Sequence, residues 1–385
     1  MSHRERAESP RERNMEFTIA RSDLVRELGL LQGVVEKRTT IPILSNVLVE
    51  ASGEKITLTA TDLELGIRCS CPAKVKKSGS GTIPAKRLLD YVRLLPEAEI
   101  SVKVADNHWA NITCGRSRTR IAGMSRDSYP ELPASSEKVA DLPLGLLSSM
   151  IQQTIFAISN EESRFTLNGA LMLLKADGLV MVATDGHRLA MTERVLENEG
   201  AASGFRALIP RKAMGEILKL SAEAGGETAI AFSATDNHLF FQIGERLLIS
   251  RKLTGNFPDY ERVLPKEHPH AVILAKDELK AAIERVAQFS DERSRAVRVQ
   301  VSAGELKIHS SLSETGESED SIGATYDGPS VEIGFNALYV LDFLKACGES
   351  SVAFHFKDAA SAGEMRPAGD EVNFIYRYVI MPMRI

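Results

Sequence analysis

The residue types most suited to chemistry are concentrated in one short segment, Thr184-Asp185-Gly186-His187-Arg188-Leu189. Asp185 and His187 are the types that form an acid–base pair in enzymes. The supporting motifs of a hydrolase or a metalloenzyme are missing, since the sequence has no His-Glu-x-x-His, no glycine-rich phosphate loop and no nucleophile elbow. The same segment is also typical of an Asp-Gly turn with solvated side chains, or of part of a binding surface.

Two further groups could bind a metal ion but have unfavourable spacing. Cys69 and Cys71 alternate along one predicted strand, and no second pair accompanies them. Zinc sites need four ligands in a recognisable pattern, so these cysteines are expected to be core or edge thiols. His268-Pro269-His270 lies in a predicted linker. We therefore expect neither a metal ion nor a cofactor.

The elements that would position these residues recur along the chain. Ile209 to Leu220 (IPRKAMGEILKL) has counterparts at Ile83 to Leu94 and Ile333 to Leu344, 126 residues before it and 124 after it. The shared apolar positions are spaced by three, which predicts a helix with one buried face. These positions are Leu88, Tyr91 and Leu94, then Met214, Ile217 and Leu220, then Leu338, Leu341 and Leu344.

A second face of this helix is polar in the first two copies, with Lys86, Asp90 and Arg93 in one and Lys212, Glu216 and Lys219 in the other. Basic residues also open both helices, as Lys86-Arg87 and Arg211-Lys212. Mixed charges are usual on a solvated face, but their recurrence at equivalent places favours a shared role. The period indicates three homologous domains, of which the third is the least faithful copy.

The bulk composition is that of a globular protein of several domains. The chain has 385 residues, 43% of them hydrophobic and 26% charged, with a net charge of −5. Four cysteines without paired spacing favour a reducing compartment such as the cytoplasm. No apolar run is long enough to cross a membrane, and no signal peptide precedes the fold. The expected domains are 15–136, 137–268 and 269–385, after a disordered tail at 1–14.

Each domain is expected to be α+β, with two helices and several strands. A helix near Ser22–Val34, capped by Ser22 or Asp23, precedes strands in the first domain. The segments Glu131–Lys138 and Leu264–His270 look like linkers. The third domain is expected to hold an acidic, serine-rich loop at Ser313–Asp320, and a final strand at Val379–Ile385. Three such units in a row could stack as an arc with their helices on one side.

Several segments together resemble one family, the bacterial DNA polymerase III beta subunits, or sliding clamps. They are Val182–Leu189 (VATDGHRL), Asn256–Pro265 (NFPDYERVLP) and Val379–Ile385 (VIMPMRI), combined with the triplication. The resemblance covers residues 15 to 385. It implies a head-to-tail homodimeric ring around duplex DNA, without enzymatic activity. Its implied partners are the DNA polymerase III alpha subunit, the clamp loader, and other polymerases and repair proteins that bind through a short linear peptide, with no membrane partner.

For a ring of the kind that the resemblance implies, helix packing supports two chains instead of one. Packed helices lie about 8–10 Å apart, so six of them closed in a circle leave a hole far too narrow for duplex DNA. Twelve helices leave a bore of about 24 Å once about 10 Å is subtracted for their diameter. A ring that is linked topologically to DNA needs no tight, sequence-specific contact, so a negative net charge is no obstacle.

By resemblance, the partner-binding pocket lies between the second and third domains. Its apolar members would form an adaptable slot, while Arg188, Arg262, Asn336 and Arg384 could hold peptide carbonyls or an acidic residue. A family position that is often aromatic is Ser294 here, and Ala360 and Ala362 precede a Gly/Pro-containing insertion. The implied pocket residues are Leu167, Thr184, Gly186, His187, Arg188, Leu189, Pro258, Arg262, Val263, Asn336, Tyr339, Val379, Met381, Pro382, Met383 and Arg384.

The resemblance also implies residues for DNA contact and for the dimer interface. An adjacent aromatic pair found in some relatives is Phe165-Thr166 here. The residues expected to contact DNA are Arg38, Lys86, Arg87, Arg164, Phe165, Arg211 and Lys212. The residues expected at the dimer interface are Arg116, Thr119, Ile121, Gln288 and Phe289.

Two other classes of protein stay open at this point. One is an enzyme that uses Asp185 and His187, although the first domain has Asp62-Leu63-Glu64 at the equivalent position, so only one copy would be catalytic. The other is a monomeric DNA-binding protein, which a measurement of molecular size would distinguish from a dimer.

Overall fold

The computed structural model describes residues 14–35, 40–196, 204–224, 229–312, 316–369 and 374–384. The predicted tail, apart from Asn14, and Arg38 lie outside these ranges. The chain divides into an N-terminal unit, formed by residues up to Gly145 together with Gly215–Arg251, and a C-terminal unit, formed by Leu146–Met214 and Lys252–Ile385. Each unit therefore combines one terminal repeat with part of the middle repeat.

The first repeat begins as the sequence predicts, except at the start of its first helix. The N-cap of that helix is Ala20 and not Ser22 or Asp23, and no side chain of the cap accepts a hydrogen bond. Instead, Glu97 Oε1 accepts the backbone N–H of Ser22 at 3.0 Å, so a distant carboxylate satisfies one free donor. The elements are β1 (Met15–Ala20), α1 (Arg21–Leu31), η1 (Pro42–Ser45), β2 (Asn46–Ser52), β3 (Lys55–Thr61), β4 (Leu65–Pro72), β5 (Lys74–Lys77), β6 (Gly79–Pro84), α2 (Ala85–Arg93), β7 (Glu99–Val104), β8 (Trp109–Cys114), β9 (Ser117–Ala122) and η2 (Arg126–Ser128).

The second repeat has the same alternation of elements. A strand ends at Pro210, inside the repeated segment that was predicted as a helix. Glu216 is buried, although the sequence pattern placed it on a solvated face. The elements are β10 (Lys138–Pro143), α3 (Leu144–Thr154), η3 (Ile155–Ala157), η4 (Phe165–Leu167), β11 (Gly169–Leu174), β12 (Gly178–Thr184), β13 (Arg188–Val195), β14 (Phe205–Pro210), α4 (Arg211–Ala222), β15 (Ala229–Ala234), β16 (His238–Ile243), β17 (Arg246–Arg251) and η5 (Tyr260–Arg262).

The third repeat contains the two largest departures from prediction. Part of the acidic segment predicted as a loop is a strand, because Gly316–Gly323 pairs along its whole length with the preceding strand. The final strand ends at Ile380, five residues earlier than predicted. The elements are β18 (His270–Ala275), α5 (Lys276–Val286), η6 (Ala287–Phe289), β19 (Ala296–Ser302), β20 (Glu305–Leu312), β21 (Gly316–Gly323), β22 (Val331–Asn336), α6 (Ala337–Ala346), β23 (Ser351–Phe356), β24 (Gly363–Ala368) and β25 (Ile375–Ile380).

Each unit is built on an eight-stranded antiparallel sheet that joins two repeats. In the N-terminal unit the order is β10-β15-β16-β17-β4-β3-β2-β6, so β17 of the second repeat pairs with β4 of the first. In the C-terminal unit the order is β14-β11-β12-β13-β25-β24-β23-β18, and β13 pairs with β25. A smaller sheet completes each unit, with the orders β5-β1-β7-β8-β9 and β21-β20-β19-β22.

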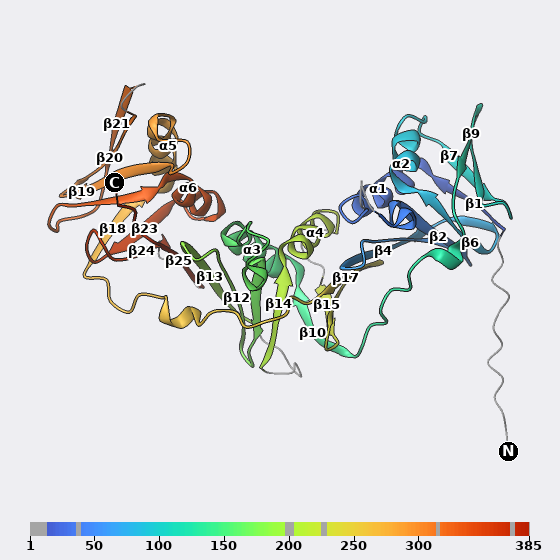
Figure 1. Cartoon of the computed structure of the whole chain (residues 1–385), viewed down its shortest axis with the longest axis horizontal. Helices are drawn as coiled ribbons and strands as arrows, with labels where there is room; N and C mark the ends of the chain where they lie inside the picture. The colour runs from blue at the N-terminus through green and yellow to red at the C-terminus, as the bar shows by residue number, and fades with distance from the viewer. Residues whose placement is uncertain are drawn as a thin grey trace, which may run out of the picture. The chain divides into compact units, whose positions relative to one another are not determined.

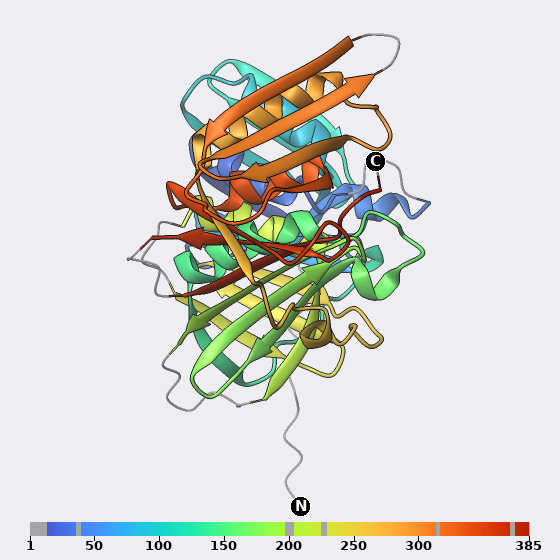
Figure 2. The same cartoon turned by 90° about the vertical axis from the view of Figure 1, so that its left-hand side faces the viewer.

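The helices α1, α2, α5 and α6 pack within their own units. In the N-terminal unit α1 contacts α2 and the strands β3 and β4 (Figure 1). In the C-terminal unit α5 contacts α6 and lies beside β20 and β21, which are orange in Figure 2. Six of the nine helix positions predicted by the spacing of three are buried, and Tyr91 is only half-buried. Leu94 and Leu338 are 85% and 47% exposed, so the pattern is wrong at these two positions.

A buried carboxylate bound to arginines lies in each unit. In the N-terminal unit Glu27 accepts two hydrogen bonds from Arg246, at 2.8 and 3.0 Å. In the C-terminal unit Glu364 is fully buried and binds Arg366, Arg377 and His268. Glu364 lies on β24, so residues 363–368 of the segment that the sequence suggested was an insertion belong to the sheet. None of the described helices is long and apolar enough to cross a membrane.

Candidate functional site

The segment Thr184–Arg188 forms a tight turn between β12 and β13. Thr184 Oγ1 donates to the carbonyl of Arg188 at 2.6 Å and accepts the N–H of Gly186 at 3.1 Å. Asp185 Oδ1 accepts the N–H groups of His187 and Arg188, at 2.9 and 3.0 Å. Gly186 has φ = +90°, a conformation that glycine adopts without strain. The predicted Asp-Gly turn is therefore confirmed and His187 is exposed, but Arg188 is not the solvated side chain that this interpretation expected. The Asp185 carboxylate accepts the hydrogen bonds that hold the turn.

The Arg188 guanidinium is embedded in the C-terminal unit. Its side chain is only 9% exposed, and it lies 4.2 Å from the centre of the Tyr339 ring. It donates to Asp185 Oδ2 at 3.0 Å, to Asp342 Oδ2 at 2.7 Å and to the carbonyl of Phe156 at 2.6 Å. These partners come from the turn, from α6 and from η3. Arg188 thus connects three elements. Each of its guanidinium nitrogens donates to a partner within the chain, whereas the sequence predicted that they could hold a peptide.

The electrostatics of this network keep Arg188 charged. Burial alone lowers the pKa of a guanidinium, because the charged form loses its hydration. The neighbouring hydroxyl of Tyr378 and the carboxylates of Asp342 and Asp185 outweigh burial, so the pKa of Arg188 is raised. The same site raises the pKa of Tyr378, chiefly through burial. Arg188 therefore stays charged at neutral pH, and Tyr378 keeps its proton.

A pocket of about 130 Å³ opens beside this turn, within the C-terminal unit. Its floor belongs to an apolar cluster that includes Leu189 and Val379, both of which are almost fully buried. The rim is more exposed, with Val263 at 44% and Met381 at 48%. The lining residues are Leu167, Thr184, Gly186, His187, Arg188, Leu189, Pro258, Tyr260, Val263, Val379 and Met381.

Most of the residues expected in a pocket are brought together there, and six are not. Arg262 is 86% exposed in its side chain and pairs with Asp259 at 2.8 Å. Met383 donates its N–H to the carbonyl of Gly334 at 2.8 Å, in an isolated bridge beyond the last strand. The residues outside the lining are Arg262, Asn336, Tyr339, Pro382, Met383 and Arg384.

Two of these six have structural tasks. Asn336 is the N-cap of α6, where its Oδ1 accepts the N–H groups of Leu338 and Tyr339. Its Nδ2 donates to the carbonyl of Ser294 at 3.2 Å. Tyr339 stacks on Arg188 and its carbonyl accepts the hydroxyl of Tyr378 at 3.0 Å. Both residues support the wall behind the pocket instead of lining it.

Tyr260 lines the pocket and was missed by the sequence analysis. It begins η5, inside the same NFPDYERVLP segment that signalled the family. Its ring packs against the apolar cluster of the pocket, and burial raises the pKa of its hydroxyl. Tyr260 could have been predicted as a pocket residue from its position two residues after Pro258, within a segment that was already assigned to this wall.

The residues expected at DNA lie in both units. On α2 Lys86 pairs with Asp90, and Arg87 is exposed. In the C-terminal unit Arg164 pairs with Glu161 at 2.7 Å and donates to the carbonyl of Asp185 at 2.9 Å. Phe165 beside it is 71% exposed. Arg211 donates to Asn160, and Lys212 follows it at the start of α4.

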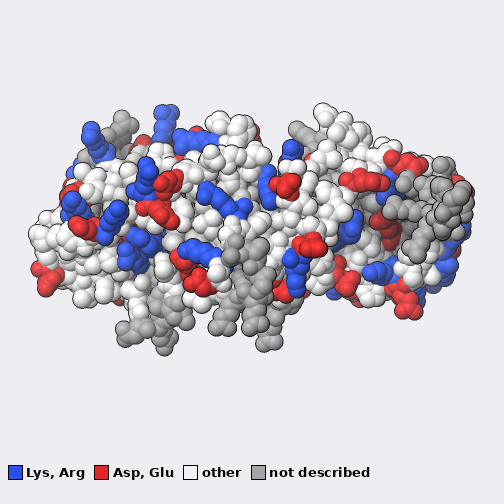
Figure 3. Space-filling view, turned by 90° about the horizontal axis from the view of Figure 1, so that it is seen from below, with Lys and Arg blue, Asp and Glu red and all other residues white. Residues whose placement is uncertain are grey.

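Charge alone does not mark a nucleic-acid surface on the face drawn in Figure 3. On that face lysine and arginine side chains are interspersed with aspartate and glutamate. A face with such a mixture of charges does not hold a nucleic acid strongly by charge alone. The described residues contain no group of three or more His, Cys, Asp or Glu side chains arranged to hold a metal ion.

The residues expected between protomers lie on or beside the outer strands β9 and β21 of the two smaller sheets. Thr119 and Ile121 belong to β9, the outer strand of the five-stranded sheet, with Arg116 in the turn before it. Ile121 is 3% exposed and belongs to the core of its own unit. Gln288 and Phe289 lie in η6, and a β-carbon on Gly316 of the outer strand β21 would lie 3.5 Å from Phe289.

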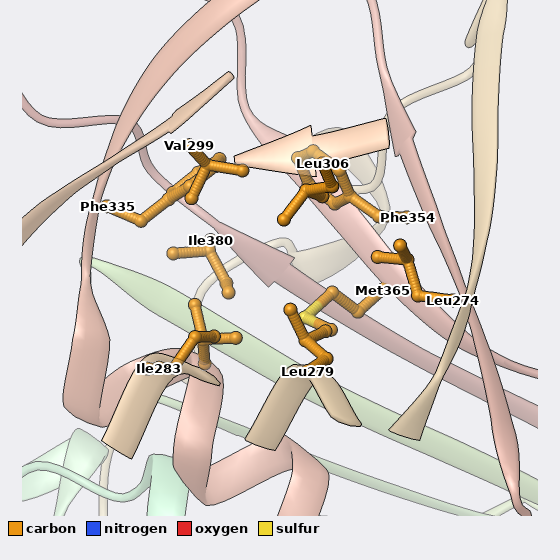
Figure 4. Close-up of a pocket in the computed structure, with 10 residues that line it drawn as sticks. Leu274, Leu279, Ile283, Val299, Leu306, Phe335, Phe354, Met365 and Ile380 are labelled. Carbon is orange, nitrogen blue, oxygen red and sulfur yellow. The ribbon is translucent and has the colours of Figure 1, made fainter. Parts of the chain in front are cut away.

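A second apolar cavity lies inside the third repeat, with room for little more than one water molecule at about 20 Å³. Leu279 and Ile283 of α5 face Val299, Leu306 and Phe335 across it (Figure 4). No polar side chain lines this cavity, so it offers a ligand no orienting contact.

The fold and the site together define a protein of three tandem α+β domains with one apolar pocket at a strand junction. The three domains match, in order, the N-terminal, central and C-terminal domains of the DNA polymerase III beta subunit, over residues 15–133, 141–259 and 261–384. The beta sliding clamp of Pseudomonas putida is 35% identical over 377 residues, 96% of this chain and 100% of the relative. The clamp of Caulobacter vibrioides is 36% identical over 379 residues, with the same coverage.

Solved structures agree with these sequence relatives. A sliding clamp from Pseudomonas aeruginosa bound to griselimycin has a TM-score of 0.90 at 33% identity, covering 97% of this chain and 100% of the other. The clamp from Bacillus subtilis has a TM-score of 0.91 at 27% identity with the same coverage. The chain therefore belongs to the DNA polymerase III beta subunit family. It is a DNA sliding clamp for the replicative polymerase and not an enzyme, which removes the acid–base interpretation of Asp185 and His187.

Proposed function

We propose that two copies of this chain close head to tail into a ring around duplex DNA in the cytoplasm. The pocket of the C-terminal unit then binds short linear segments of the DNA polymerase III alpha subunit, the clamp loader, and other polymerases and repair proteins. The observation that carries this proposal is the match to full-length sliding clamps along 96% of the chain. The domain boundaries near residues 136 and 268 belong to the same proposal.

The outer strands of the two smaller sheets support the head-to-tail contact. An outer strand has unpaired backbone N–H and C=O groups that a strand of another chain can complete. The segment around β9 is basic, with Arg116, Arg118 and Arg120, whereas β21 contains Glu317 and Glu319. Opposite charges on two such edges favour pairing between copies, and a head-to-tail contact uses both edges in each protomer.

The apolar pocket supports peptide binding. Methionine, leucine and valine side chains adapt to several partner sequences, and the exposed rim at Val263 and Met381 is accessible to a segment from another protein. His187 at the rim is exposed and can donate or accept a hydrogen bond. A structure of a related clamp contains griselimycin, so that protein takes a ligand on this fold.

DNA contact is proposed to be loose and directed at phosphates. Lys86, Arg87, Arg211 and Lys212 open α2 and α4, and Arg38, Arg164 and Phe165 are the further candidates. Arg164 already holds the Thr184–Arg188 turn through Asp185, so only part of its hydrogen-bonding capacity is available. Contacts of this kind position a duplex without reading its sequence, which permits sliding.

The decisive experiment is retention on DNA of defined topology. The protein is loaded onto nicked circular DNA with a clamp loader and ATP, and the circle is then cut once. A closed ring stays on the circle and leaves promptly after linearisation. Equal retention on both forms would contradict the ring.

The assembly is tested separately by reversing the charge of one edge. Arg118→Glu with Phe289→Ala alters the basic edge and an apolar residue beside the acidic edge, and should shift the dimer to monomer in sedimentation velocity at low micromolar concentration. Ile121 is left unchanged because it supports the core of its own unit. An unchanged dimer would show that these edges are not the interface.

A further inference from the structure

The N-terminal unit contains a turn that repeats the pocket turn bond by bond. Thr61 Oγ1 donates to the carbonyl of Leu65 at 2.9 Å and accepts the N–H of Leu63 at 3.0 Å. Asp62 Oδ1 accepts the N–H groups of Glu64 and Leu65, at 3.0 and 2.7 Å. Leu63, at the position of Gly186, also has a positive φ, +77°. Thr61 to Leu65 therefore corresponds to the turn beside the pocket.

The strands around this turn are also equivalent. Gly66 on β4 pairs with Ile249 on β17, as Leu189 on β13 pairs with Val379 on β25. One step further, the N–H of Arg251 donates to the carbonyl of Glu64 at 2.8 Å.

The corresponding bond in the C-terminal unit runs from the N–H of Met381 to the carbonyl of His187, at 3.0 Å. Leu44 in η1 matches Leu167 in η4, with the same spacing to its turn in the sequence. The N-terminal unit thus has counterparts of the main pocket walls.

The two places differ in what lies between the walls. Leu189 in the pocket wall is replaced by Gly66, and Leu132 lies against this glycine. A β-carbon on Gly66 would lie 3.0 Å from Leu132 Cδ2 and 3.3 Å from its Cδ1. Leu132 follows Tyr129-Pro130 as Tyr260 follows Phe257-Pro258, so it is the counterpart of a pocket-lining residue.

The segment that contains Leu132 is fixed in place. Tyr129 is almost fully buried in a cluster with Ile43, Leu44 and Leu48. Its hydroxyl donates to the carbonyl of Thr59 at 2.9 Å. Ile41, just before the η1 residues of this cluster, and Leu63, in the Thr61–Leu65 turn, are exposed apolar side chains, at 44% and 52%.

We propose that the N-terminal unit holds a second copy of the peptide site, which is kept closed by Leu132 of the same chain. Leu132 occupies the place that an apolar anchor of a short peptide takes in the open pocket. The absence of a side chain on Gly66 lets Leu132 approach the backbone, whereas Leu189 keeps Tyr260 at the rim. Removal of the Leu132 side chain opens a site for the same class of ligand, a short peptide with an apolar anchor. This inference rests on the proposed peptide pocket.

The test is the stoichiometry of peptide binding to the full-length protein. The probe is a synthetic peptide from the clamp-binding segment of a replicative polymerase, titrated by calorimetry at protein concentrations well above the dissociation constant. The unmodified chain binds one peptide. Leu132→Ala binds two, the second about 10- to 100-fold more weakly. Leu94→Ala, which removes an 85% exposed leucine from the same unit, binds one.

A second variant keeps the result interpretable. Gly66→Leu places a side chain where the Leu132 methyl groups lie, so it displaces Leu132 and also opens a second site. One peptide per chain in both variants, with cooperative melting retained, overturns the inference while leaving the first pocket intact. If the wild-type chain binds no peptide, the proposal for the pocket in the C-terminal unit is wrong instead. A gain of one bound peptide in Leu132→Ala would then still support the second site.

Discussion

The pocket in the C-terminal unit and its closed counterpart in the N-terminal unit have the same backbone and different side chains. Both are built on a Thr-Asp turn and on a strand pair that joins two repeats. The difference lies at two positions of the strand after the turn, where Arg188-Leu189 in one unit corresponds to Leu65-Gly66 in the other. Triplication thus supplies the scaffold, and a few substitutions decide whether a junction is open to a partner.

Arg188 shows how the open version is supported. In the N-terminal unit the equivalent residue, Leu65, is a buried apolar side chain. In the C-terminal unit Arg188 reaches α6 and η3 through charged and backbone partners. The pocket therefore has a rigid polar support behind an apolar slot, as a site that must hold its shape without a ligand requires.

The largest change in stability is expected from removing the Arg188 side chain. Arg188→Ala leaves Asp185 and Asp342 without their cation, and loss of one partner in a buried ion pair costs about 3–5 kcal/mol. We expect the free energy of unfolding to fall by that amount in urea denaturation. Arg262→Ala, which breaks an ion pair whose arginine is 86% exposed, should change it by less than about 1 kcal/mol. A loss below 1 kcal/mol in both variants would show that Arg188 is not a support.

Acid should destabilise the C-terminal unit more than the N-terminal unit, because only the carboxylate cluster of the C-terminal unit contains histidines. His355 packs against His268, with ring centres 5.5 Å apart. Burial, then the nearby Arg366 and His268, lower the pKa of His355 from 6.5 to about 4. The unfolded chain therefore binds this proton more tightly, and stability is lost as the pH falls from about 6.5 to about 4.

The slope contributed by one such proton is at most about 1.4 kcal/mol per pH unit. His355→Asn should flatten the pH dependence of the unfolding free energy in this window. Below this pH window, protonation of Glu364 also lowers the unfolding free energy. Burial raises its pKa, but hydrogen bonds from Arg377, Arg366 and His268 outweigh burial and lower that pKa to about 2. An unchanged slope in His355→Asn would contradict this account.

The smallest effect is expected from exchanging residues between the two turns. Leu63→Gly relieves a left-handed conformation at an exposed leucine and should stabilise the protein by up to about 1 kcal/mol. Gly186→Ala should destabilise it, because the φ of +90° is unfavourable for alanine and the new β-carbon would lie 3.1 Å from Arg164 Nη1. Thermal melting checks the two signs. Equal signs would show that the turns are not equivalent.

Much of the fold could be predicted because it is encoded locally and repeated. The spacing of three in the repeated segment identified α2, α4 and α6, and matched offsets between repeats identified three α+β domains. The prediction was wrong where tertiary pairing overrides composition. The acidic segment near Glu317 and Glu319 is typical of a loop by composition, but its backbone pairs with β20 and satisfies its hydrogen bonds there.

The candidate site was predictable in its residues and not in their roles. The family resemblance located the turn and most of the pocket wall, including Leu189 and Val379. It could not show that the Arg188 guanidinium is held by Asp185, Asp342 and the carbonyl of Phe156, since a sequence does not reveal which partners a guanidinium finds. Closure of the second junction was equally invisible, because it depends on the approach of Leu132 to Gly66 across 66 residues of sequence.

The most direct test of the central claim is a peptide titration of the open pocket. Val263→Ala with Met381→Ala removes two rim side chains that are 44% and 48% exposed, so folding should be unaffected. Buried anchors at such a site usually contribute over 1 kcal/mol each. Affinity for a polymerase-derived clamp-binding peptide should therefore fall at least tenfold, about 1.4 kcal/mol. Ile375→Ala, at an apolar residue that is 48% exposed on the same unit, should leave it unchanged. Unchanged affinity in the Val263 and Met381 double variant would place the partner site elsewhere.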